Sequence, residues 1–72
     1  MTIKVFGKES GCSKCDVVKS KLDKKNVEYE YITDIEIVTD ALQKAKTMFT
    51  PVIEIDGTLY NFTQANALIN NM

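Results

Sequence analysis

The sequence has no histidine, arginine or tryptophan, and only one proline and two cysteines among its 72 residues. Without histidine there is no imidazole to act as a general base or a metal ligand. A zinc site needs about four Cys, His or carboxylate ligands, so the two cysteines cannot build one within a single chain. The missing arginine and the net charge of −1 argue against nucleic-acid binding, which normally uses a basic surface.

Long apolar runs are also missing, since the longest uninterrupted runs span only a few residues. We therefore expect neither a membrane span nor a secretory signal, and we expect a cytoplasmic protein. The hydrophobic fraction of 44 % and the charged fraction of 26 % are those of an ordinary folded protein, with room for a single domain over residues 1–72. In a reducing compartment, two thiols indicate catalysis or metal binding before a structural crosslink.

Apolar periodicity predicts seven elements in the order β-α-β-α-β-β-α. Strands are expected over 3–6, 27–32, 52–55 and 58–62, and helices over 12–26, 36–46 and from residue 63 onward. The first two strands should run parallel, and Asp56-Gly57 should turn the last two into an antiparallel hairpin. The sequence therefore predicts an α/β fold, a four-stranded mixed sheet with helices on both faces.

Three polar residues are candidates for the ends of the helices. Asn26 can end the first helix in the left-handed conformation, Asp34 can cap the second, with Thr39 as the alternative, and Thr63 can cap the third. A third helix that begins at Thr63 would bury Ala67 and Leu68.

The two cysteines, Cys12 and Cys15, lie three positions apart at the expected start of the first helix. Thiols at this spacing can form a small disulfide ring and open it again with little movement elsewhere. Only a thiolate attacks a disulfide, and the helix N-terminus with Lys8 and Lys14 nearby favours the charged form of Cys12. Cys15, one turn further along, should be more buried, so we expect Cys12 to attack and Cys15 to resolve the mixed disulfide.

Thr50-Pro51 directly precedes an apolar strand. Proline lacks the donor that a central strand needs, but it fits as the first residue of a strand. A cis Thr50-Pro51 bond would turn the chain sharply there, and a trans proline that simply opens the strand is the alternative.

With these motifs the chain resembles the glutaredoxin family, whose members have a thioredoxin-like fold. The segment from Val5 to Cys15 is similar to the start of the family's active site, and the segment 50–57 is similar to its cis-proline strand and turn. The resemblance implies a dithiol thiol–disulfide oxidoreductase in which Cys12 is the nucleophile, Cys15 the resolving thiol and Pro51 the cis proline. It also implies that the Thr50 backbone pairs with an extended substrate.

The resemblance further implies the partners: a disulfide-containing protein or a glutathione mixed disulfide as substrate, and glutathione or a thioredoxin-type reductase as electron source. It includes the small glutaredoxin-like hydrogen donors of ribonucleotide reductase. We expect a monomer with no bound cofactor or metal. The positions expected to contact substrate are Lys8, Ser13, Lys14, Thr50, Pro51 and Thr63.

Two stretches depart from the family pattern. Common glutaredoxins have Pro-Tyr between the cysteines, where this chain has Ser13-Lys14. Members that bind glutathione usually have a Gly-Gly pair after the fourth strand, where this chain has residues 60–64 without glycine. Glycine lets a ligand approach the backbone closely, and Tyr60 or Asn61 could obstruct that approach.

Two other function classes are open at this point. One is a carrier of an iron–sulfur cluster held by Cys12 of two chains together with added thiols, although the second cysteine counts against it. The other is a structural adaptor with an idle thiol pair.

Overall fold

The computed structural model describes residues 2–72 and contains the seven predicted elements in the predicted order. The strands are β1 (Ile3–Phe6), β2 (Glu30–Ile32), β3 (Val52–Ile55) and β4 (Thr58–Tyr60). The helices are α1 (Ser13–Lys24), α2 (Ile35–Lys44) and α3 (Phe62–Asn70). No helix of this part of the chain is both long and apolar enough to cross a membrane.

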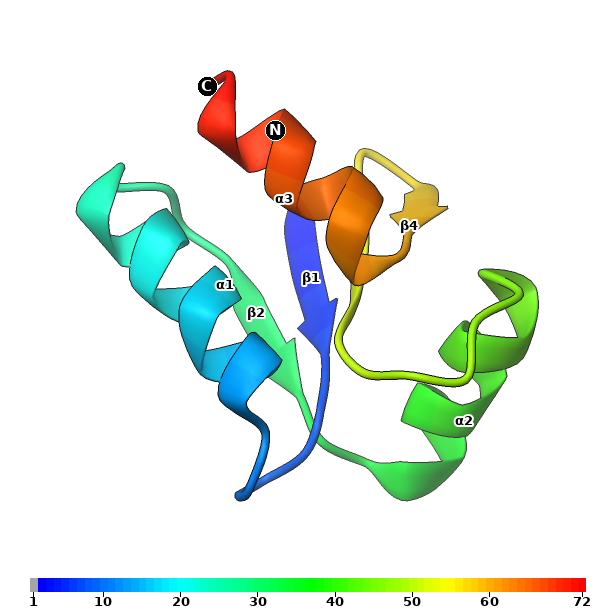
Figure 1. The fold of residues 1–72 in the computed structure, drawn as a ribbon. Coiled ribbons are helices and arrows are strands. Elements are labelled where there is room, and N and C mark those ends of the chain that lie inside the picture. Colours follow the sequence, from blue (N-terminus) through cyan, green and yellow to red (C-terminus); the bar gives the residue numbers. More distant parts are fainter. Residues whose placement is uncertain (1) are drawn as a thin grey trace.

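The strands form one mixed sheet in the order β2-β1-β3-β4. β1 pairs in parallel with β2 and antiparallel with β3, and β3 pairs antiparallel with β4. Figure 1 shows α1 and α3 together on one side of the sheet and α2 on the other. The α/β fold with helices on both faces is therefore confirmed, and β2 lies at an edge as its alternating sequence suggests.

Each face of the sheet has its own apolar cluster because neighbouring side chains of a strand point to opposite faces. Val5 of β1 packs on one face with Val18 and Leu22 of α1 and with Ile69 of α3. The adjacent Phe6 belongs to the cluster on the other face, with residues of α2. β1 is thus fixed from both sides, and its end is a rigid point from which the next loop departs.

Turn residues adopt the backbone conformations that the sequence predicts. Asn26 follows α1 with a φ of 57°, and Asp34 caps α2 by accepting from the backbone N–H groups of Glu36 and Ile37. Asp56 and Gly57 both have positive φ, 50° and 88°. The hairpin turn therefore has the twist that suits the flanking strands.

Four predicted boundaries are wrong by two or three residues, among them the end of α1, which lies at Lys24 rather than at residue 26. β2 does not begin at Val27, because the N–H of Val27 donates to the carbonyl of Leu22 and so completes the end of α1. α2 ends at Lys44 rather than Lys46, and Lys46 itself has a φ of 56°. β4 ends at Tyr60 because the chain turns there into α3.

The predicted cap of the third helix is also wrong. Asn61, not Thr63, is the N-cap of α3, and its side chain and that of Gln64 accept from each other's backbone N–H groups. This reciprocal arrangement satisfies two donors at once, which a cap at Thr63 would leave unpaired. The earlier start turns Ala65 and Ile69 toward the core, and the two residues expected to be buried, Ala67 and Leu68, are exposed.

We expect Asn61→Ala to lower the free energy of unfolding by about 1 kcal/mol, because it removes this cap. Thr63→Ala is the matched control and should change it little, since Thr63 is exposed on the first turn. Urea unfolding followed by circular dichroism measures both. Equal losses in the two variants would contradict the assignment of Asn61 as the cap.

Candidate active site

The loop between β1 and α1 brings Cys12 to the N-cap position of α1. Gly11 precedes it with a φ of 70°, a conformation that glycine adopts without strain. The N–H of Cys15 donates to the sulfur of Cys12 across 3.2 Å, so this sulfur lies where the first unpaired N–H groups of the helix point. That position favours negative charge, as the sequence predicts for the attacking sulfur.

The two cysteines differ in exposure. Cys12 is half-buried and Cys15 is completely buried, which confirms the expected order of burial. Their sulfurs are joined in a disulfide with the Cα atoms 5.2 Å apart, so the structure represents the oxidised state. Cys12 is the sulfur that a partner can reach.

Cys15 fits under the start of the loop because residue 7 is glycine. A Cβ at Gly7 would lie 2.6 Å from the sulfur of Cys15 and 2.7 Å from the hydroxyl oxygen of Tyr31. Both distances are shorter than real Cβ contacts. Any side chain at this position would push Cys15, the tyrosine or the loop aside.

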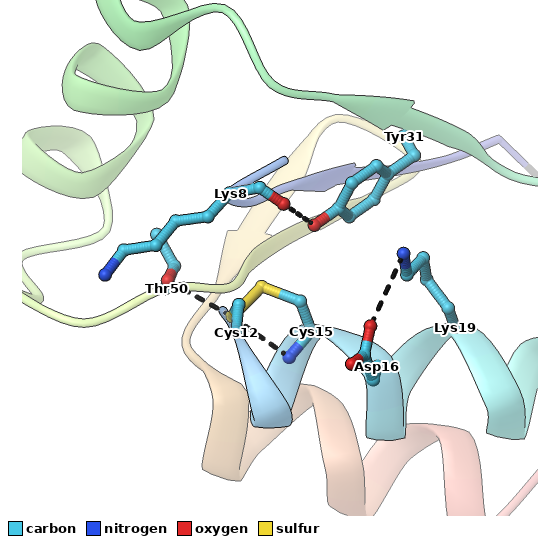
Figure 2. Close-up of a disulfide and its surroundings, with 7 residues drawn as sticks. All are labelled: Lys8, Cys12, Cys15, Asp16, Lys19, Tyr31 and Thr50. Atoms are coloured by element: carbon cyan, nitrogen blue, oxygen red, sulfur yellow. Dashed lines mark hydrogen bonds and ion pairs between the residues drawn. A yellow bond between two sulfur atoms is a disulfide. The ribbon is translucent and has the colours of Figure 1, made fainter. Parts of the chain in front are cut away.

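Thr50 and Pro51 lie opposite the cysteines. The Thr50-Pro51 peptide bond is cis, and Pro51 is fully buried just before β3. The hydroxyl of Thr50 is 3.5 Å from the sulfur of Cys12 and is the donor, since a disulfide sulfur carries no hydrogen. Figure 2 shows this contact and the side chain of Lys8, which extends toward Thr50.

A groove of about 310 Å³ runs past Cys12. Of the described residues that line it, two are cations, Lys8 and Lys14, and none is acidic. The full lining consists of Lys8, Gly11, Cys12, Ser13, Lys14, Leu42, Met48, Phe49 and Thr50. The groove is therefore positively charged on the side of the cysteines and apolar on the other.

Five of the residues expected to act on substrate, Lys8, Cys12, Ser13, Lys14 and Thr50, are thus together in one groove. Pro51 and Cys15 lie behind it, both buried. Thr63 is the exception among the expected contacts, because it is exposed on α3 and does not line the groove.

Sequence reasoning missed the aromatic residues around Lys14. Its ammonium lies 5.8 Å from the ring centre of Phe49 and 5.4 Å from that of Phe62. Met48 and Phe49 are 88 % and 72 % exposed, so the groove has an uncovered apolar margin. The available signal was two large apolar residues directly before Thr50-Pro51.

Tyr31 was also missed. It reaches from β2 to the cysteine loop, and its hydroxyl donates to the backbone carbonyl of Lys8 (Figure 2). The Lys19 ammonium lies 4.2 Å from the centre of its ring. Burial raises the pKa of Tyr31, Lys19 lowers it and Asp16 raises it, with a net rise. The phenol therefore keeps its proton in neutral solution.

Within residues 2–72, no group of three or more His, Cys, Asp or Glu side chains is arranged to hold a metal ion. What the geometry offers is a reachable sulfur at a helix N-terminus, a buried sulfur one turn behind it and a groove that leads to the first. This arrangement suits exchange of a disulfide with another molecule.

The family model named Glutaredoxin matches residues 3–60, which include both cysteines and Thr50-Pro51. The chain belongs to the glutaredoxin family. Among solved structures it is similar to the glutaredoxin-like protein NrdH-redoxin from Escherichia coli, with a TM-score of 0.78 and 18 % identity. That match covers 100 % of this chain and 95 % of the other, and it shows the shared fold. A comparison with curated proteins finds no match.

We expect Gly7→Ala to lower the free energy of unfolding by about 1–3 kcal/mol, the usual cost of overpacking a tight site. The added methyl group would collide with Cys15 and Tyr31. Ser10→Ala, in the same loop but exposed, is the control and should have little effect. Urea unfolding of the oxidised proteins measures the difference, and a Gly7→Ala variant as stable as the wild type would refute the close fit.

Proposed function

We propose that this protein is a dithiol thiol–disulfide oxidoreductase that reduces disulfides of other proteins, or glutathione mixed disulfides, by cycling between its dithiol and Cys12–Cys15 disulfide forms. One observation carries the proposal. A half-buried sulfur at the N-cap of α1 is joined to a fully buried sulfur one turn behind it, in a groove closed by Thr50. Membership of the glutaredoxin family supports it.

In the first step the thiolate of Cys12 attacks one sulfur of a substrate disulfide. A bond forms between Cys12 and that sulfur, the substrate disulfide breaks, and the other substrate sulfur leaves as a thiolate that takes a proton from water. The N–H of Cys15 and the hydroxyl of Thr50 lie 3.2 and 3.5 Å from the Cys12 sulfur, where they can stabilise its negative charge. The cations Lys8 and Lys14 line the same groove.

In the second step Cys15, as a thiolate, attacks the sulfur of Cys12. The mixed disulfide breaks, the second substrate thiolate leaves and is protonated, and the Cys12–Cys15 disulfide forms. The substrate has then gained two electrons and two protons, and the protein has lost them. A donor must return two electrons and two protons before the next cycle.

The groove suggests how a substrate is held. The backbone at Thr50, before the buried Pro51, can pair with an extended segment that carries the disulfide. Lys8 and Lys14 would attract carboxylates of that segment, with Ser13 between the cysteines as a further polar contact. Met48 and Phe49 would cover its apolar side chains. Thr63 can act only at the periphery, since it lies outside the groove.

For the electron source we favour a thioredoxin-type reductase over glutathione. The position where glutathione-binding members have glycines is occupied here by Tyr60, which packs against the core, and Asn61, which caps α3. Replacing Tyr60 by glycine would remove its packing against the core, and replacing Asn61 would remove the cap of α3. NrdH-redoxin, which shares this fold, is a glutaredoxin-like protein with a thioredoxin-like activity profile. We place the reaction in the cytosol, carried out by a monomer.

In the decisive assay, NADPH consumption is followed with insulin as the disulfide substrate and thioredoxin reductase as the donor. The wild type should turn over. Cys12→Ser should abolish turnover because the attacking sulfur is gone. Cys15→Ser should accumulate a mixed disulfide between Cys12 and the substrate, detectable by mass spectrometry, because nothing resolves it.

Ser20→Ala, an exposed substitution on α1, is the control and should retain full turnover. Replacing the donor by glutathione and glutathione reductase tests the choice of electron source, and faster consumption there would overturn it. Full turnover by Cys12→Ser would overturn the function itself.

A further inference from the structure

The space that Gly7 leaves empty is filled from two sides. The sulfur of Cys15 comes from α1 below, and the hydroxyl of Tyr31 comes from the neighbouring strand β2. Both atoms lie within 2.7 Å of the point that a Cβ of residue 7 would occupy. Because residue 7 has no side chain, the phenol hydroxyl and the buried sulfur face the same small space.

The hydroxyl has a partner in the oxidised state. It donates to the carbonyl of Lys8, in the loop just beyond Gly7 (Figure 2). The disulfide sulfur of Cys15 is a weak, uncharged acceptor. While the disulfide is intact, the carbonyl of Lys8 is therefore the stronger acceptor for the hydroxyl of Tyr31. The phenol needs only a small rotation of its O–H bond to point elsewhere.

The resolving step requires a negative charge on a buried sulfur. Cys15 is fully buried and must become a thiolate before it can attack Cys12. A buried unpaired charge is costly, and the described residues include no buried polar or charged side chain that could offset it. The sequence has no histidine either, and a neutral hydrogen-bond donor can stabilise a buried thiolate without adding a second buried charge.

We propose that the Tyr31 hydroxyl is the hydrogen-bond donor that stabilises the thiolate of Cys15 during resolution of the mixed disulfide. The inference rests on the proposed function. In the step, the Cys15 thiol loses its proton to water, Tyr31 keeps its own proton and turns its O–H from the Lys8 carbonyl to the sulfur. The thiolate then forms the bond to Cys12 and the substrate thiolate leaves.

The charged groups that act on the phenol are Lys19 and Asp16, both on α1. Lys19, on α1, lies over its ring and also pairs with Asp16 across 3.6 Å. Lys8 is on the loop, and Tyr29 lies on the segment before β2. Burial, the first of the causes, raises the pKa of Tyr31. The hydroxyl therefore keeps its proton, and remains a donor, in neutral solution.

The test uses Tyr31→Phe, which keeps the ring and its contact with Lys19 but removes the hydroxyl. Reduced protein is mixed in a stopped-flow instrument with a symmetrical aromatic disulfide whose released thiolate absorbs visible light. Attack by Cys12 releases one thiolate in a first phase, and resolution by Cys15 releases the second in a later phase. The two steps are thus measured separately in one trace.

We expect the first phase to be unchanged in Tyr31→Phe. The second phase should slow about tenfold near neutral pH, because the variant loses one hydrogen bond to a charged group. The pH midpoint of the second phase should move upward. Tyr29→Phe, which removes another half-buried phenol, is the control and should leave both phases as in the wild type.

A folded Tyr31→Phe variant with a wild-type second phase would overturn the proposal. So would equal slowing of both phases with no movement of the midpoint, which indicates a purely structural role. Loss of the first phase in the wild type would refute the proposed function instead.

If Tyr31→Phe does not fold, a pH titration of the wild-type protein followed by NMR tests the proposal. The chemical shift of the ring carbon that bears the hydroxyl of Tyr31 should move in the reduced protein as pH rises through the ionisation of Cys15, and not in the oxidised protein. An unmoved resonance would overturn the proposal.

Discussion

The close fit of the Cys15 sulfur beneath Gly7 is the contact on which the rest of the site depends. It fixes α1 against the end of β1, because any Cβ at residue 7 would collide with that sulfur. With α1 in this place, its N-cap residue Cys12 is only half-buried, and the N–H of Cys15 points at the Cys12 sulfur. The glycine at position 7 thus makes room for the buried Cys15, while Cys12 is reachable from the groove.

The second half of the site comes from a part of the chain far away in sequence. Val52 of β3 pairs antiparallel with Phe6 of β1, so the residue pair before β3, Thr50 and the buried Pro51, is brought to the end of the sheet where the cysteine loop starts. The hydroxyl of Thr50 reaches Cys12 as a result. The groove runs along this line, with Lys8 and Lys14 and the exposed Phe49 among its lining residues, and it is where we propose that substrate binds.

The sequence was enough to predict the element order, the strand pairing of the sheet and which cysteine is the more buried, because each rests on local spacing: Asp56-Gly57 for the hairpin, and Cys12 and Cys15 for the motif. The sequence-based prediction failed where the outcome depends on a neighbouring residue or strand as well as on the residue itself. Thr63 is a good cap by type, but Asn61 wins because Gln64 completes a reciprocal pair. Tyr31 looked like one more residue of an alternating strand, and only the pairing of β2 with β1 brings its hydroxyl to the cysteines.

The central claim is that the environment makes Cys12 the reactive thiolate and keeps Cys15 protected until resolution. Alkylation of the reduced protein with a limiting amount of iodoacetamide at mildly acidic pH, followed by peptide mass spectrometry, tests it directly. The account predicts that the label is found on Cys12 and is nearly absent from Cys15. Equal labelling of the two cysteines, or preferential labelling of Cys15, would contradict it.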